Sequence, residues 1–160
     1  VVALIAILYI VVPLGQESSS VPSGPKAADF SLTDIDGNAF SLSSFSDRVV
    51  VLDFMSTTCY FCNLEIDALK SLFDKYSKSA TIISISVDPI HDEEAILRQY
   101  REAYGIKWTL ARDVTGVSNT YEVLELPTMF IIDGEGRLYT KHVGLTSYDV
   151  LSREIGKLLD

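Results

Sequence analysis

The sequence is short of basic residues and of cysteine, and each shortage narrows the possible functions. Its 13 Lys and Arg stand against 22 Asp and Glu, which gives a formal net charge of -9 without any basic stripe. Because nucleic-acid binding requires clustered cations, we expect no nucleic-acid partner. The two cysteines are too few for a disulfide-stapled scaffold, but they suffice for one redox pair.

Charge is also missing from the first fourteen residues, Val1–Leu14, which are almost entirely apolar. As a helix they would rise roughly 21 Å, less than the roughly 30 Å of a bilayer's hydrocarbon core. Because the chain opens on Val rather than Met, we interpret residues 1–14 as the end of a longer transmembrane anchor. A signal-peptide core, or a buried strand or helix of the fold, is the alternative. Residues 15–26, rich in Ser, Gly and Pro, should form a flexible linker.

Residues 27–160 have no internal repeat, and they are long enough for one core but short for two. Two apolar runs rich in β-branched residues, 49–54 and 81–87, predict central strands covered on both faces. Residues 60–77, between the two runs, have helical spacing. The order strand, helix, strand predicts a right-handed crossover and parallel strands.

The remaining segments predict a mixed α/β sheet with helices on both faces. Asp36-Gly37 lies between two short apolar segments and predicts an N-terminal hairpin, and residues 133–136 predict a second hairpin connection. Further helices are expected at 92–104, 114–123 and 147–159, and further strands at 107–110, 128–132 and 138–143.

The two cysteines form a Cys-x-x-Cys motif, Cys59 and Cys62, at the predicted start of the helix after the first central strand. A helix N-terminus presents unpaired N–H groups and a positive dipole end, so a thiol there ionises more readily and becomes the nucleophile. Cys62 follows about one turn later. Cys59 is therefore predicted to attack a partner's disulfide and Cys62 to resolve the mixed disulfide.

Two other interpretations of the cysteines are a structural disulfide and half of a metal site. His91 and His142 would complete four zinc-type ligands, but they lack the close spacing of structural zinc sites. We therefore expect no metal ion, and no cofactor besides the redox-active pair itself.

Two acidic residues accompany the motif. Glu65 falls on the same helical stripe as Cys62 and the apolar residues, where desolvation should raise its pKa and allow proton exchange with the thiols. The alternative is an edge residue that reaches solvent. Asp53 interrupts the apolar run of a central strand, so it is either a buried proton acceptor for Cys62 or a structural hydrogen-bonding residue.

Asp53 six residues before Cys59 resembles thioredoxin, in which the matching Asp is the buried acid. Other motifs are similar to the membrane-anchored TlpA/ResA-like branch of the thioredoxin-like superfamily and to the related thiol-specific antioxidant group. They are the leader Ala28-Asp29-Phe30-Ser-Leu, Asp36-Gly37, Glu65 three residues after Cys62, Leu126-Pro127-Thr128, and Phe130-Ile-Ile-Asp133-Gly-Glu-Gly-Arg-Leu138. Together they span residues 27–144 in matching order.

The resemblance implies a thioredoxin-like fold, a central mixed sheet with an N-terminal β-hairpin extension. It also implies that Pro127 is cis and lies against the cysteines, and that Leu126 offers its backbone to a substrate peptide. A trans proline starting an edge strand is the alternative. The implied partners are protein thiols and disulfides, and a membrane or soluble thiol electron donor. The implied location is the membrane, with the catalytic domain outside the cytoplasm, where reduction of apocytochrome c is one possible task.

Several positions depart from the family pattern. Thr58 stands where the family usually has Trp, Tyr60 and Phe61 replace the more common Gly-Pro or Pro-Pro, and Asp53 stands where the anchored branch often has Asn. Tyr60 and Phe61 are interpreted either as an exposed rim for partner docking or as packing residues.

Two competing functions remain. A peroxidase is suggested by the peroxiredoxin-like leader. However, Leu52 occupies the position, seven residues before the reactive cysteine, where a peroxiredoxin has proline, and Cys62 follows Cys59 too closely for the usual resolving cysteine. A non-enzymatic copper-delivery module of the same superfamily would use a longer cysteine spacing and a histidine.

Overall fold

The computed structural model describes residues 24–160, so the predicted anchor and most of the predicted linker lie outside the described residues. The strands are β1 (Ser31–Thr33), β2 (Ala39–Ser41), β3 (Val49–Met55), β4 (Ala80–Ser86), β5 (Thr109–Arg112), β6 (Thr128–Ile132) and β7 (Leu138–Val143). The helices are η1 (Leu42–Phe45), α1 (Tyr60–Tyr76), α2 (Glu94–Tyr104), α3 (Val117–Thr120) and α4 (Tyr148–Leu159).

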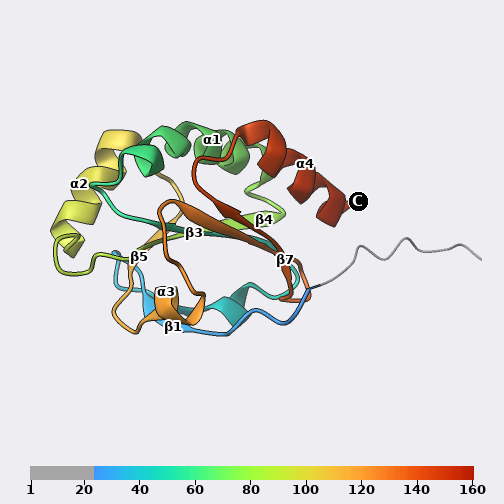
Figure 1. Ribbon diagram of the computed structural model, residues 1–160, viewed down its shortest axis with the longest axis horizontal. Coiled ribbons are helices and arrows are strands. Elements are labelled where there is room, and N and C mark those ends of the chain that lie inside the picture. Colours follow the sequence, from blue (N-terminus) through green and yellow to red (C-terminus); the bar gives the residue numbers. More distant parts are fainter. Residues whose placement is uncertain (1–23) are drawn as a thin grey trace, which may run out of the picture.

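A five-stranded sheet forms the centre of the fold (Figure 1). Its strand order is β5-β4-β3-β6-β7. β3 pairs parallel with β4 and antiparallel with β6, while β4 and β5 are parallel and β6 and β7 antiparallel. β1 and β2 form a separate antiparallel pair. The mixed sheet, the parallel crossover through α1 and the N-terminal hairpin are therefore confirmed.

Helices cover both faces of the sheet because β3 is apolar on both (Figure 1). Val49, Val51 and Met55 pack toward α1, α2 and α4. Val50, Leu52 and Phe54 pack toward the hairpin, η1 and α3, as the alternation of side chains along a strand requires. Asp53 is two residues from both Val51 and Met55, so its side chain points to the same face of the sheet, toward the layer that contains α1.

The predicted helix over residues 114–123 is wrong in extent, since α3 covers only Val117–Thr120. Gly116 has a left-handed φ of 80° and Glu122 a φ of 50°, so the backbone turns away from helical geometry on both sides. The Asp113 carboxylate also accepts hydrogen bonds from the N–H groups of Gly116, Val117 and Ser118, which fixes where the helix begins. The strand expected at 107–110 lies two residues later, at β5.

One edge of the sheet collects the connections that form the site. β3, β4 and β5 end at this edge, β6 begins there and β7 ends there. We call it the disulfide edge, because α1 starts from it immediately after Cys59. None of the helices within residues 24–160 is both long and apolar enough to span a membrane.

Candidate active site

Cys59 and Cys62 are joined in a disulfide at the first turn of α1, with their Cα atoms 5.2 Å apart. Cys59 is the N-cap residue, and its Sγ accepts a hydrogen bond from the Cys62 N–H at 3.1 Å. Cys59 is half-buried, whereas Cys62 is buried. In the reduced protein the same N–H and the helix terminus would stabilise a Cys59 thiolate. This stabilisation and the greater exposure of Cys59 support the prediction that Cys59 is the attacking thiol.

The loop before Cys59 is held by a carboxylate that the sequence analysis did not single out. Asp92 is buried, and its Oδ2 accepts from the Thr57 N–H at 2.9 Å and from the Ser86 hydroxyl at 2.6 Å. Its Oδ1 accepts from the Thr57 hydroxyl. The Thr57 carbonyl in turn accepts from Asn63 in α1. These contacts tie the end of β3, the end of β4 and the start of α1 together around the disulfide.

Asp53 lies in the core next to the buried cysteine. Asp53, Cys62, Ser84 and Trp108 line the same small cavity. The Ser84 hydroxyl donates to Asp53 Oδ2 at 2.7 Å, and Trp108 Nε1 donates to the same hydroxyl oxygen at 2.9 Å. Because an indole N–H can only donate, the single proton of Ser84 is directed to Asp53. Burial raises the pKa of Asp53 to about 6, and the Ser84 hydrogen bond opposes this rise.

Glu65 is only 1% exposed, so it lies on the buried stripe where the helical pattern places it. Its Oε1 accepts from the Thr146 N–H at 2.7 Å, and its Oε2 has no hydrogen-bond partner among residues 24–160. Burial, together with the charge on Asp53, raises the pKa of Glu65 to about 8, and the Thr146 N–H opposes both. Near neutral pH, Asp53 is therefore mostly ionised and Glu65 mostly protonated.

The residues predicted to receive the substrate also belong to the disulfide edge. The Leu126–Pro127 bond is cis, as the resemblance implies, and it precedes β6, whose Thr128 pairs with Phe54 of β3. The Pro127 carbonyl accepts from the Gly144 N–H at 2.8 Å. Tyr60 and Phe61 are both exposed and contact each other with ring centroids 5.4 Å apart. Their exposure favours the docking interpretation over the packing one.

Metal ligands are not gathered in the described part of the chain, where no group of three or more His, Cys, Asp or Glu side chains could hold an ion. The two histidines instead contact carboxylates, His91 with Asp88 and His142 with Glu154.

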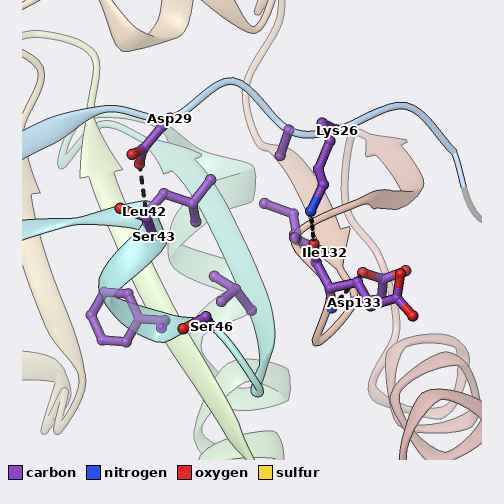
Figure 2. Close-up of a pocket in the computed structure, with 12 residues that line it drawn as sticks. Lys26, Asp29, Leu42, Ser43, Ser46, Ile132 and Asp133 are labelled. Carbon is purple, nitrogen blue, oxygen red and sulfur yellow. Dashed lines mark hydrogen bonds between the residues drawn. The ribbon is translucent and has the colours of Figure 1, made fainter.

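A pocket of about 250 Å³ lies at the opposite edge of the sheet, at the beginning of β3 and the end of β6 (Figure 2). Leu42 and Ile132 contribute apolar surface to it, and the Lys26 ammonium donates to the Glu135 carbonyl at its margin. This pocket contains none of the predicted site residues.

Comparisons with known proteins agree with this geometry. A sequence model of the AhpC/TSA family matches residues 23–141. The chain belongs to the AhpC/TSA family. It is 30% identical over 137 residues to a thiol-disulfide oxidoreductase ResA of Bacillus cereus, covering 84% of this chain and 78% of the relative. It is 27% identical over 124 residues to the thioredoxin-like protein YneN of Bacillus subtilis, covering 78% of this chain and 73% of YneN.

Among solved structures, a Chlorobium tepidum protein assigned as a thiol:disulfide interchange protein DsbE superposes with a TM-score of 0.77 at 27% identity. The match covers 88% of this chain and all of the Chlorobium chain, 100%. This AhpC/TSA-family protein thus has a thioredoxin-like fold and is a thiol–disulfide oxidoreductase of ResA/DsbE type, with Cys59 and Cys62 as its redox pair.

Sequence reasoning placed the cysteines, Asp53 and Glu65 near one another but missed the residues that hold them. Ser84 had a visible signal, because it interrupts the apolar run of β4 and pairs in register with Asp53. Asp92 was predicted only as the start of a helix. Thr146 acts through its backbone N–H, which no side-chain pattern reveals.

Proposed function

We propose that this protein reduces disulfides in other proteins outside the cytoplasm, while its N-terminal segment holds it at a membrane. The observation that carries the proposed exchange is the buried carboxylate at the buried cysteine, and the resemblance to the TlpA/ResA-like branch supports the reducing direction. An ionised Asp53 beside Cys62 can accept the thiol proton that must leave before Cys62 resolves a mixed disulfide.

The exchange proceeds in two displacements. The Cys59 thiolate attacks one sulfur of the partner's disulfide, so an S–S bond forms to Cys59 and the partner's other sulfur leaves as a thiolate. Cys62 then transfers its proton to Asp53 and attacks the Cys59 sulfur, which releases the partner's second thiolate. Two electrons pass to the partner, the partner's sulfurs take up protons from Glu65 and solvent, and Cys59 and Cys62 end as a disulfide. A thiol electron donor returns them to the reduced form.

Substrate contact is proposed for Leu126, Pro127, Tyr60 and Phe61. The main chain of Leu126 pairs with an extended segment of the partner, which makes recognition tolerant of sequence. The aromatic rings of Tyr60 and Phe61 cover the partner's apolar side chains beside its cysteine.

The apolar sequence of residues 1–14 supports a membrane anchor, and the resemblance to the TlpA/ResA-like branch supports an extracytoplasmic position. Cytochrome c maturation is the proposed process, in which the partner is an apocytochrome with its cysteines oxidised. The electron donor is a membrane or soluble dithiol.

Reduction of insulin by the pre-reduced protein, with dithiothreitol as the final donor, tests the proposed chemistry. We expect Cys59→Ser to abolish turnover, and Cys62→Ser to lose turnover while holding the substrate as a mixed disulfide. A Cys59→Ser variant that reduces insulin at the unmodified rate would refute the assignment. Rapid consumption of hydrogen peroxide, with no reduction of insulin, would favour the peroxidase instead.

A further inference from the structure

Several large apolar side chains are exposed in the chain segments at the disulfide edge. We call the following set the apolar rim: Tyr60, Phe61, Leu64, Ile90, Leu124 and Leu145. Leu124 is 93% exposed and Tyr60 is 68% exposed, so these side chains contribute little to the core. The rim comes from the start of α1 and from three loops far apart in sequence, yet all four segments meet at one edge. Concentrated exposed apolar surface of this kind marks a contact with another molecule.

The same edge has carboxylates but no lysine or arginine in its loops. Residues 56–64, 87–93, 113–116, 121–127 and 144–147 include no Lys or Arg. Glu93, Glu122 and Glu125 in these loops are exposed. Two cations lie at the adjoining strand ends, where Arg112 donates to the Pro89 carbonyl and Lys141 to the Glu122 carbonyl. They offset part of the charge of the three exposed glutamates, so the surface that a partner meets is apolar and, on balance, acidic.

We propose that the redox site selects a polypeptide disulfide flanked by basic and apolar side chains, in preference to an anionic small-molecule disulfide such as oxidised glutathione. The inference rests on the proposed function and specifies its substrate class. The acidic loops attract a cationic partner and repel an anionic one, which changes the rate of encounter more than the chemical step. The apolar rim comes from four chain segments, so a polypeptide with side chains on both sides of its cysteines can bury more of it than a small disulfide can.

The position of the acidic residues matches this occupant. Glu122 and Glu125 belong to the same loop as Leu126, whose main chain is proposed to pair with the partner. Side chains of an extended segment alternate in direction, so a lysine near the reacting cysteine can approach these carboxylates while its neighbour packs on Leu124. The electron transfer is unchanged: the two cysteines are oxidised and the peptide disulfide gains two electrons and two protons.

The test uses two synthetic peptides that contain the same intramolecular disulfide, one flanked by lysine and the other by glutamate. The pre-reduced protein is mixed with each peptide, and the second-order rate constant of disulfide reduction is measured at low and high salt. We expect the lysine peptide to react about tenfold faster at low salt, and the ratio to shrink at high salt because screening weakens exposed charges. Oxidised glutathione should react more slowly than either peptide.

The double variant Glu122→Gln/Glu125→Gln should lower the ratio between the two peptides to about threefold. Its matched control, Glu102→Gln/Asp160→Asn, removes the same charge at the ends of α2 and α4, which lie at the opposite edge of the sheet, and should leave the ratio unchanged. Equal, measurable rates for both peptides, or equal effects of the two double variants, would overturn the inference alone. If the protein reduced neither peptide and did not reduce oxidised glutathione, the proposed function would be overturned as well.

Discussion

Asp92 and Asp113, in the loops of the disulfide edge, are buried among donors, whereas Asp53 and Glu65, beside the cysteines, are buried almost without them. Asp92 accepts three hydrogen bonds and Asp113 accepts four. Asp53 and Glu65 accept one each from residues 24–160. Desolvation with so few donors raises the pKa of Asp53 to about 6 and contributes most to raising that of Glu65 to about 8. All four residues are buried, so the number of donors distinguishes the two carboxylates that hold the loops from the two that we propose to exchange protons.

Asp92→Asn should produce the largest effect, because it removes the charge of a buried carboxylate that accepts three hydrogen bonds. One carboxylate oxygen becomes an amide nitrogen, so the Thr57 hydroxyl must turn to accept, or the Thr57 N–H and the Ser86 hydroxyl lose their acceptor. We expect the free energy of unfolding to fall by about 3 kcal/mol.

Urea unfolding of the oxidised protein measures this loss. Asp67→Asn is the matched control, since its side chain is 95% exposed in α1, and it should change the free energy by less than about 0.5 kcal/mol. If both variants unfolded at the same urea concentration, Asp92 would not hold the loop.

Glu65→Gln should remove a pH dependence of stability. The native carboxyl, with its pKa raised to about 8, keeps a proton that the unfolded chain releases from about pH 4.5 upward. The native state therefore loses stability as the pH rises through this window, and it is not penalised below it. Gln does not ionise, so the variant should be more stable than the unmodified protein by about 2 kcal/mol at pH 9 and equal to it at pH 4.

Unfolding in urea at pH 4, 6.5 and 9 is the measurement for Glu65→Gln. The pH profile of thiol alkylation in the reduced protein should change in parallel. A constant difference between the two proteins at all three pH values would mean that the carboxyl of Glu65 does not titrate in the folded state.

Asp53→Asn should also stabilise the native protein at high pH, but by less than Glu65→Gln does, because the pKa of Asp53 is raised only to about 6. The penalty develops between about pH 4 and pH 6, and its removal should stabilise the protein by about 1 kcal/mol at pH 8. The variant also lacks the carboxylate that we propose as the acceptor of the Cys62 proton. The mixed disulfide with a model peptide should therefore decay about tenfold more slowly at pH 7, as followed by mass spectrometry of quenched samples.

Ser84→Ala should lower the free energy of unfolding by about 1 kcal/mol, because the buried Trp108 N–H loses its acceptor. The Ser84 hydroxyl donates to Asp53 and thereby opposes the rise in its pKa, so removing the hydroxyl should raise that pKa further. The pH midpoint for decay of the mixed disulfide should then move to a higher value. A midpoint that moves to lower pH would show that Ser84 does not donate to the carboxylate.

Local patterns in the sequence predicted most of the elements and the positions of the reactive groups. The central strands, the buried stripe of α1 and the Cys-x-x-Cys motif each depend on residues close in sequence. The contacts that were missed join distant positions: Thr57 and Asp92 are 35 residues apart, and Glu65 and Thr146 are 81 apart. Which chain segments meet at one edge follows from the topology, and a single sequence gives no direct measure of it.

The helix expected at 114–123 was wrong for a local reason. Gly116 and Glu122 take positive φ values, and the Asp113 carboxylate caps the turn between them. Apolar spacing alone did not reveal this interruption.

Trp108 is the one tryptophan in the 160 residues. Its indole N–H donates to the Ser84 hydroxyl, which in turn donates to the buried carboxylate of Asp53. We therefore expect the ultraviolet emission of Trp108 to respond to the charge of Asp53 and to whether the sulfurs of Cys59 and Cys62 are bonded to each other. A change in emission on reduction would let the cycling between disulfide and dithiol be followed in real time without an attached dye.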